Sequence, residues 1–244
     1  MRSLRMLLLA VTAMIGVARA DNIAMGVETT EYYPFYHLEG GNYAGFAREV
    51  LDAFAAKYHH TLSYKPLDIP PLLTAMLNGE VDLKFPDDAH WAADKRAGKT
   101  IYYSKPLIDV YEGLMVQSAN VGKGLDSIKT IGTVRGFSPF VYLDQVKSGK
   151  IKVIEAQSFS ALVKIGSMKE VDGIYISPTI GDYQLEHTFH NPGLLKFDKS
   201  LPNATSHFGV SSTKRQDLVK QFDEFLEQEK PAIDALRTKY HISH

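Results

Sequence analysis

Two adjacent carboxylates, Asp87 and Asp88, are the residues most able to do chemistry, and they follow an apolar stretch and a proline, Pro86. Carboxylates that lie beside aromatic rings bind cations and amines through ion pairs and cation–π contacts. The rings that could contribute to such a site are those of Tyr32, Tyr36 and Trp91. The alternative, with equal support, is an Asx turn in which the Asp pair caps the next helix.

One cation, Lys84, stands within the apolar stretch that precedes the Asp pair. An unpaired lysine buried in a strand would cost too much free energy. The side chain must therefore pair with Asp87, bind an anionic ligand group in a cleft, or face solvent at the end of the strand.

A second group of polar residues follows the predicted strand that ends at Val134. Ser138 precedes Pro139, an order typical of a helix N-terminus with Ser138 as the N-cap. Free backbone N–H groups at such a terminus favour an anionic ligand group, although an ordinary cap that binds nothing fits as well. Arg135 precedes Gly136 in a tight turn, so its side chain points either into a cleft or away from it.

Catalysis has little support in the sequence. The chain has no cysteine, no Gly-x-Ser-x-Gly motif and no glycine-rich phosphate loop. Glu31 or Asp87 could act as a general acid in a cleft. Asp87, Asp88 and His90 could share a metal ion, but this spacing arises easily by chance. We therefore expect a protein without enzymatic activity, metal or cofactor.

The elements that must position these residues alternate along the chain. Strands are predicted at residues 23–27, 61–64, 81–85, 130–134, 151–154 and 171–176, and helices at residues 46–58, 70–77, 139–147, 159–167, 179–186, 216–228 and 232–240. The same helix-to-strand joint occurs twice, at Asn78-Gly79-Glu80-Val81-Asp82-Leu83 and at Lys169-Glu170-Val171-Asp172-Gly173. Such alternation builds parallel sheets covered by helices, so the sequence predicts an α/β fold with two similar lobes.

Two segments, residues 111–116 and 201–210, are predicted to carry the chain between the lobes. This division assigns residues 21–114 and 206–244 to the first lobe and residues 115–205 to the second. Because no long linker separates them, the lobes should face each other across a cleft and close around a ligand by a hinge motion.

Residues 1–20 are typical of a secretory signal peptide, with basic residues, an apolar run at residues 6–17 and a small-x-small site at Ala18-Arg19-Ala20. The run is shorter than the ~20 residues that span a bilayer, so a retained anchor is the weaker alternative. We expect cleavage after Ala20 and release into the periplasm. Without cysteine, neither a lipid-modified cysteine nor a disulfide is available.

Composition narrows the possible partners. The signal segment holds three of the 27 basic residues and none of the 28 acidic ones, so 24 basic residues and a net charge near −4 are left in the mature chain. A mildly acidic chain without a basic stripe is no nucleic-acid binder and gives no support for a membrane-surface role. With 45% apolar residues, each lobe has material for its own core, and we expect a monomer.

Three motifs accompany the two joints: Tyr33-Pro34-Phe35, Gly45 to Val50, and Gly132 to Gly136. With these motifs in this order and spacing, the chain resembles the family 3 extracellular solute-binding proteins of amino-acid ABC transporters. The resemblance extends over nearly the whole mature length. The resemblance implies a two-lobed type II periplasmic-binding-protein fold, or Venus flytrap, with mixed or parallel sheets. It also implies capture of a small polar solute, such as an amino acid or amine, for an inner-membrane ABC permease. A sensory subunit that presents ligand to a receptor, and a dehydratase of the same fold acting on prephenate-like acids, are the alternatives.

The resemblance also implies ligand contacts. Tyr32 stands where an aromatic ring stacks on the ligand, and Ser138 stands where a hydroxyl contacts a carboxylate. Ala97 stands where relatives carry the Arg that clamps the ligand carboxylate, with Arg96 one residue away, and Ser177 replaces an amine-binding Asp. The complete predicted set is Tyr32, Tyr36, Asp87, Trp91, Arg96, Arg135, Phe137, Ser138 and Ser177.

These departures change the expected ligand. Asp87 and Asp88 stand where amino-acid-binding relatives carry small hydroxyl residues, so they could replace the missing amine partner. Arg96 could still reach a carboxylate, or it could lie on a solvated helix surface. We therefore expect an amine-bearing or cationic solute held in the first lobe, rather than an α-amino acid by default.

Overall fold

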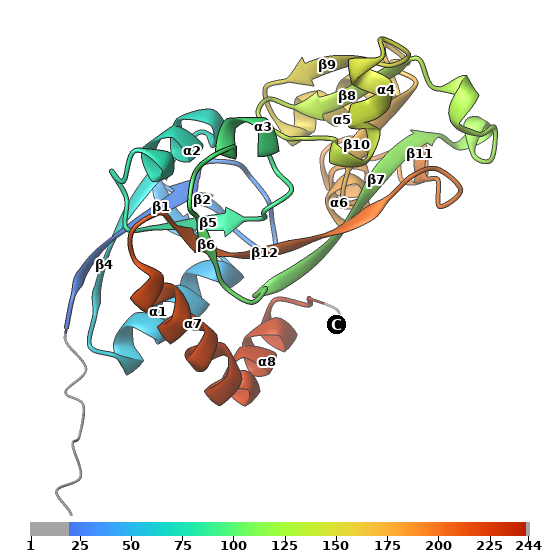
Figure 1. The fold of residues 1–244 in the computed structure, drawn as a ribbon. Helices are drawn as coiled ribbons and strands as arrows, with labels where there is room; N and C mark the ends of the chain where they lie inside the picture. Colours follow the sequence, from blue (N-terminus) through green and yellow to red (C-terminus); the bar gives the residue numbers. More distant parts are fainter. Residues whose placement is uncertain (1–19, 243–244) are drawn as a thin grey trace, which may run out of the picture.

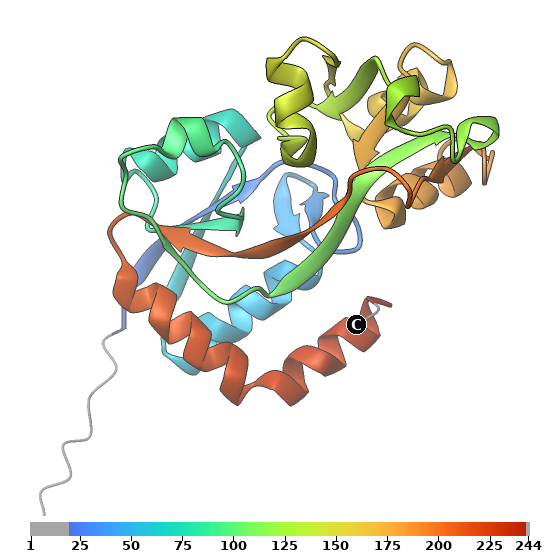
Figure 2. The ribbon, with the colours of Figure 1, turned by 45° about the vertical axis from the view of Figure 1, so that its right-hand side comes forward.

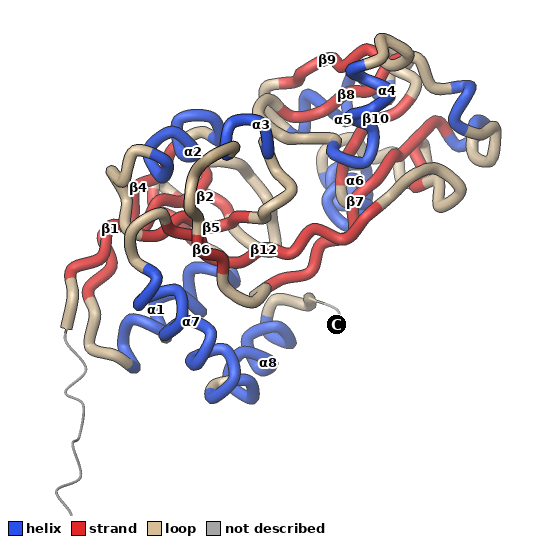
Figure 3. Tube along the Cα trace, in the orientation of Figure 1, coloured by secondary structure: helices blue, strands red, loops and turns tan. Residues whose placement is uncertain are grey.

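The computed structural model describes residues 20–242, which form two lobes joined by two long strands (Figure 1). Each lobe is a sheet with helices packed against it, so the predicted two-lobed α/β fold is confirmed (Figure 3). Apart from Ala20, the predicted signal peptide lies outside the described residues. No helix within residues 20–242 is long and apolar enough to cross a membrane.

The first lobe is built on three parallel strands in the order β4 (Thr61–Leu67), β1 (Asn22–Glu28) and β5 (Leu83–Asp87). Helices α1 (Phe46–Lys57), α7 (Gln216–Gln228) and α8 (Lys230–Lys239) lie on one side of this sheet, and α2 (Ile69–Leu77) lies on the other (Figures 1 and 2). Smaller elements are β2 (His37–Glu39), β3 (Asn42–Ala44), α3 (Ala93–Arg96) and β6 (Tyr102–Tyr103). The carboxyl ends of β1 and β5 point toward the second lobe (Figure 1).

The second lobe holds the parallel strands β10 (Gly173–Ile176), β8 (Thr130–Val134) and β9 (Lys152–Ala156), in that order. Its other elements are η1 (Ser118–Asn120), η2 (Leu125–Ser127), η3 (Phe140–Tyr142), α4 (Leu143–Lys147), α5 (Phe159–Ser167), α6 (Pro178–His187) and β11 (Leu195–Phe197). Helix α5 begins at a true cap, because the Ser158 side chain accepts a hydrogen bond from the Ala161 N–H at 3.1 Å. Its apolar face, with Leu162 and Val163 fully buried, packs on the sheet.

Two antiparallel strands, β7 (Ile108–Gln117) and β12 (Ala204–Ser212), run between the lobes and join their sheets (Figure 1). Residues 204–208 pair with residues 108–112. Beyond this stretch, β12 pairs with β5 of the first lobe and β7 pairs with β10 of the second. The paired connection is the element about which the lobes can rotate.

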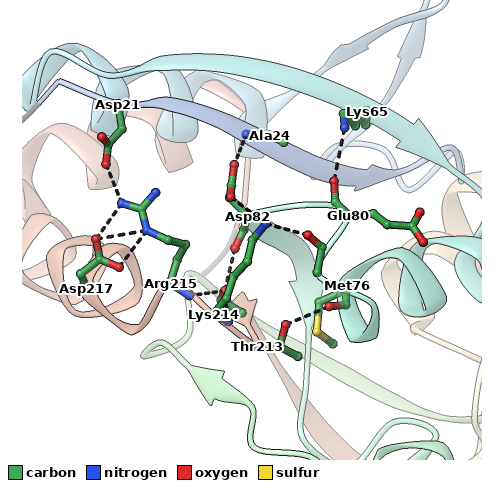
Figure 4. Close-up of polar contacts among 12 residues, drawn as sticks. Asp21, Ala24, Lys65, Met76, Glu80, Asp82, Thr213, Lys214, Arg215 and Asp217 are labelled. Carbon is green, nitrogen blue, oxygen red and sulfur yellow. Dashed lines mark hydrogen bonds and ion pairs between the residues drawn. The ribbon is translucent and has the colours of Figure 1, made fainter.

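The amino end of β1, which points away from the second lobe, is fastened to the segment after β12 (Figure 4). Arg215 Nη2 lies 2.5 Å from Asp21 Oδ2. Asp82 Oδ2 accepts the Ala24 N–H at 2.8 Å, and Asp82 Oδ1 lies 3.2 Å from Lys214 Nζ. These contacts hold the end of one hinge strand to the sheet of the first lobe.

Two of the elements that differ from the prediction lie beside the predicted site residues. Strand β5 begins and ends two residues late, because β12 pairs with it as far as Asp87, which stands opposite Gly209. Pro86 and Asp87 therefore lie inside a buried strand and not in a loop after it. The helix predicted over residues 139–147 starts instead as a 3-10 turn, in which the Tyr142 N–H bonds to the carbonyl of Pro139.

Candidate functional site

Aromatic rings from both lobes meet where β1 and β8 end. Tyr32, in the loop after β1, stacks on Tyr36 with ring centroids 5.3 Å apart. Phe137 and Phe159 of the second lobe lie against Tyr32, at 6.3 and 5.1 Å between centroids. Tyr32 is fully buried as a result, so a ligand reaches its ring only when the rings of the second lobe move away.

Trp91 extends this contact between the lobes. Its ring lies 5.0 Å from that of Phe208 on β12 and 6.5 Å from that of Phe137. Lys84 Nζ stands 5.7 Å from the centre of the Trp91 ring, within the range of a cation–π contact. Since Trp91 is the chain's single tryptophan, its fluorescence reports directly on the contact between the lobes.

Asp87 is buried on β5, and its carboxylate is occupied by cations of the same chain. Lys84 Nζ lies 2.9 Å from Oδ1. The Arg96 guanidinium binds both oxygens, with Nη2 2.6 Å from Oδ1 and Nη1 2.9 Å from Oδ2, and the Ser211 hydroxyl donates to Oδ2. Burial acts to raise the pKa of Asp87, but Lys84 and Arg96 outweigh it and hold the pKa below its ordinary value of 3.8. Asp87 is therefore a charged and fully paired carboxylate.

Arg96 is buried, so of its two predicted options the solvated position on a helix surface is wrong. Besides its two bonds to Asp87, its Nε donates to the Trp91 carbonyl at 2.6 Å and its Nη1 to the Tyr103 hydroxyl at 2.9 Å. The guanidinium thus clamps a carboxylate of the chain itself. Lys84 takes the first of its three predicted options, the pair with Asp87.

The Asx-turn alternative for the Asp pair is confirmed at Asp88 as to the turn, but its predicted capping of the next helix is wrong, because α3 begins after Ala92 without a side-chain cap. Its Oδ1 accepts the His90 N–H at 2.8 Å, and its Oδ2 accepts the N–H of His207, on β12, at 2.7 Å. The carboxylate therefore ties the loop after β5 to a hinge strand. Across residues 20–242, no three side chains of His, Asp or Glu are grouped so that they could hold a metal ion.

The two predicted serines lie at the boundary between the lobes and before α6. Ser138 is not an N-cap: its Oγ accepts the Ala92 N–H at 3.1 Å, because the 3-10 turn that follows leaves it outside any helix. This bond links the second lobe to the loop before α3. Ser177 is 3% exposed and precedes α6, where its side chain makes no capping hydrogen bond. Its contact with a ligand stays a prediction.

Little free volume remains beside most of the predicted residues. A cavity of about 40 Å³, room for a few water molecules, is lined in part by Lys84, Trp91, Arg96, Phe137 and Ser138. A ligand can enter this space only if the surrounding rings are displaced.

A much larger cavity of about 530 Å³ adjoins the small one across Ile69 and Pro70, which line both. Both lobes supply its walls, including Glu31, Asp68 and Pro70 from the first and Arg135, Gln157 and Gln184 from the second. Ligand pockets commonly measure ~300–1,000 Å³. Arg135 is the one member of the predicted set that lines this cavity, so the prediction placed most of its residues beside the main space and not in its walls.

Sequence reasoning missed two buried glutamates. Glu28, at the end of β1, accepts a hydrogen bond from the Tyr36 hydroxyl at 2.8 Å. Glu112, on β7, accepts one from the Ser206 hydroxyl of β12 and lies 3.5 Å from the Tyr32 hydroxyl. Burial raises the pKa of each carboxyl to about 7. Their signal in the sequence is weak, because a single Glu within a strand or at its end is usually solvated.

Residues 23–242 match the family model of the bacterial extracellular solute-binding proteins, family 3. The chain belongs to this family. A Bacillus subtilis (strain 168) protein with the name probable amino-acid-binding protein YxeM is 29% identical over 157 residues. These residues make up 62% of this chain and 56% of the relative, so the match spans little more than half of the relative's length.

Solved structures share the fold of this family 3 protein. The substrate-binding protein of an amino acid ABC transporter has a TM-score of 0.70 at 20% identity, over 90% of this chain and 98% of that one. A histidine kinase sensor domain similar to periplasmic binding proteins has a TM-score of 0.72 at 19% identity, over 90% and 95%. At these identities the likeness shows the fold alone, the two-lobed type II periplasmic-binding-protein fold.

Proposed function

We propose that this family 3 protein captures a small polar solute between its lobes in the periplasm and delivers it to an inner-membrane ABC permease. The observation that carries the proposal is the cavity of about 530 Å³, because both lobes supply its walls. A solute in such a cavity contacts both lobes at once, so its binding free energy favours the closed arrangement over an open one.

Closure is what a membrane partner would recognise. The lobes are joined by β7 and β12 and touch through side chains that lie far apart in the sequence. Tyr33 of the first lobe and Tyr183 of the second have ring centroids 5.3 Å apart, and the Ala92 N–H donates to Ser138 across the same boundary. Rotation about the hinge strands would break these contacts, so they distinguish the loaded from the unloaded protein.

The nature of the cavity walls supports a polar solute. Glu31, Asp68 and Arg135 provide charges, and Gln157 and Gln184 provide amide groups. The relative and the solved ABC-transporter protein are named for amino acids. An amino acid, an amine or a related compound would suit the polar cavity walls and agrees with the names of these relatives.

A thermal-shift screen over amino acids, polyamines, sugars and aromatic acids tests capture. A ligand that binds only the native state raises the Tm, and at 100 times its Kd it adds about 2.7 kcal/mol of stability. Because Trp91 lies at the lobe boundary, a true ligand should also change its fluorescence. A screen in which no small solute stabilises the protein would contradict capture.

Uptake measurements test delivery. Cells that lack the protein should lose high-affinity uptake of the solute found in the screen. Unchanged uptake together with a lost cellular response to that solute would assign the protein to sensing instead. Conversion of prephenate by the purified protein would favour the dehydratase alternative.

A further inference from the structure

The charges around the 530 Å³ cavity are separated by lobe. Its carboxylates, Glu31 and Asp68, belong to the first lobe, whereas its guanidinium, Arg135, belongs to the second. Within residues 20–242, neither Glu31 nor Arg135 has a side-chain hydrogen bond or ion pair, and both side chains are exposed. Asp68 accepts a hydrogen bond from the Thr29 hydroxyl. Opposite charges therefore line opposite walls.

The small cavity shows the reverse arrangement. Lys84 and Arg96, which line it, have nitrogens 2.6 to 2.9 Å from the Asp87 carboxylate behind them, and about 40 Å³ of free space is left. A ligand with its ammonium and carboxylate on one carbon needs an anion and a cation side by side. The adjacent charges at this place already neutralise each other, so they do not serve such a ligand.

We propose that the large cavity takes a dipolar solute whose cationic and anionic groups are several bonds apart, as in an ω-amino acid or a short peptide. This inference rests on the proposed solute-binding function. The ammonium end binds Glu31 and Asp68, and the carboxylate end binds Arg135. The stem between them lies against Pro70 and Phe159, which form apolar parts of the wall.

A dipolar solute of this kind binds one lobe with each end. Neither wall offers both charges, so both charged groups of the solute have a partner only when the lobes are together. Its two charge-assisted contacts therefore favour closure. An α-amino acid in the same cavity satisfies one wall and leaves the charge on the other wall without a partner. The cavity therefore discriminates by the distance between charges.

Isomeric pairs test the inference, because they contain the same atoms on the same carbon chain and differ in the position of the amine, which sets the charge separation. Titration calorimetry compares γ-aminobutyrate, δ-aminovalerate and ε-aminocaproate with their isomers α-aminobutyrate, norvaline and norleucine. Diglycine and triglycine represent short peptides, and butylamine and valerate each keep one charge of δ-aminovalerate. We expect an ω-amino acid or a peptide to bind at least tenfold more tightly than the α isomers and the singly charged compounds.

Two variants locate the binding site. Arg135→Gln and Glu31→Gln should each weaken binding of the best compound by about tenfold or more, the loss of one charge-assisted hydrogen bond. Lys152→Gln is the matched control, since it removes an exposed cation of the second lobe that does not line the cavity. Binding to this control should equal that of the unaltered protein.

Three results would overturn the inference: tighter binding of the α isomers, binding that neither Arg135→Gln nor Glu31→Gln weakens, or no binding by any of these compounds. The proposed function has a separate test. Capture of a small solute, on which the inference rests, fails if the broad thermal-shift screen also yields no stabilising solute.

Discussion

At the scale of single residues, burial decides what a charge can do. Asp87 and Arg96 are 1% and 7% exposed, and each compensates the charge of the other. The loss of hydration in such a pair roughly offsets the attraction, so the intact pair adds little net stability. Removal of one partner lowers stability strongly, because the other is then left buried with an uncompensated charge.

Arg96→Met is therefore expected to lower the free energy of unfolding by about 3 kcal/mol, the low end of the range for a broken buried pair, because Lys84 still lies beside Asp87. Urea denaturation followed by circular dichroism measures the loss. Lys57→Met is the control, since it breaks an exposed pair with Glu229 and should cost about 1 kcal/mol or less. Equal losses in the two variants would show that the Asp87–Arg96 pair is not formed.

Residue types predicted which side chains gather between the lobes, but not what they contact. Tyr32, Trp91 and Phe137 do meet at this boundary. Asp87 was predicted as a ligand-binding carboxylate, yet one of its partners, Ser211, is 124 residues away in the sequence. No local pattern contains such a contact, so the distinction between a free and a paired carboxylate required the fold.

At the scale of elements, the sequence predicted the bounds of a helix or strand correctly where residues near in sequence decide where it ends. Strand β8 and helices α5 and α7 have the predicted bounds. In α7 the buried residues recur at helical spacing, as at Leu218, Phe222 and Phe225. The bounds of β5 were missed because β12, more than 100 residues later in the chain, decides where its pairing stops.

The hinge strands share a buried acid, Glu112, and this element should respond to pH. Burial, with smaller contributions from Asp88 and Glu28, raises the pKa of Glu112 from 4.5 to about 7, against the hydrogen bonds from Ser206 and Tyr32. Between these values the folded protein holds a proton that the unfolded chain has released. The stability from this group is therefore fully present below pH 4.5 and is lost as the pH rises through 7.

Glu112→Gln should reduce the dependence of stability on pH, because a neutral amide does not titrate, whereas Glu28 keeps its own pKa of about 7. The expected difference from the unaltered protein is up to roughly 3 kcal/mol across the window. Unfolding by urea at several pH values between 4.5 and 7 measures it. Glu155→Gln changes an exposed carboxylate on β9 and should keep the original slope. An unchanged slope in Glu112→Gln would show that Glu112 is ionised in the folded protein.

At the scale of the whole molecule, the predicted cleavage site lies next to a well-anchored start of the first sheet. The Asp21 N–H donates to His60 Nδ1 at 3.1 Å and the Asp21 carboxylate lies 2.5 Å from Arg215, whereas Ala20 is exposed. Cleavage after Ala20 would thus leave an N-terminus that the fold already holds. Intact-mass analysis of periplasmic protein should give a chain that starts at Asp21, and a mass that includes residues 1–20 would contradict this.

The lobes come close together at Gly136, where the turn after β8 meets the start of α2. A methyl carbon at this position would lie 3.0 Å from Ile69 Cβ and 3.0 Å from Pro70 Cδ, and the residue has φ of +89°. Both neighbours belong to the other lobe. A side chain at this position therefore requires Ile69 and Pro70 of the facing lobe to move back, which disfavours full closure.

Gly136→Ala is expected to bind the solute at least tenfold more weakly and to show a larger radius of gyration in X-ray scattering. Part of any effect is local, because alanine at positive φ costs about 1–2 kcal/mol. Gly149→Ala isolates that part: this glycine of the same lobe has φ of +72° and nothing within 4 Å of its added carbon. The difference between the two variants measures the contact between the lobes. Equal affinities and equal scattering in the two variants would mean that closure does not depend on Gly136.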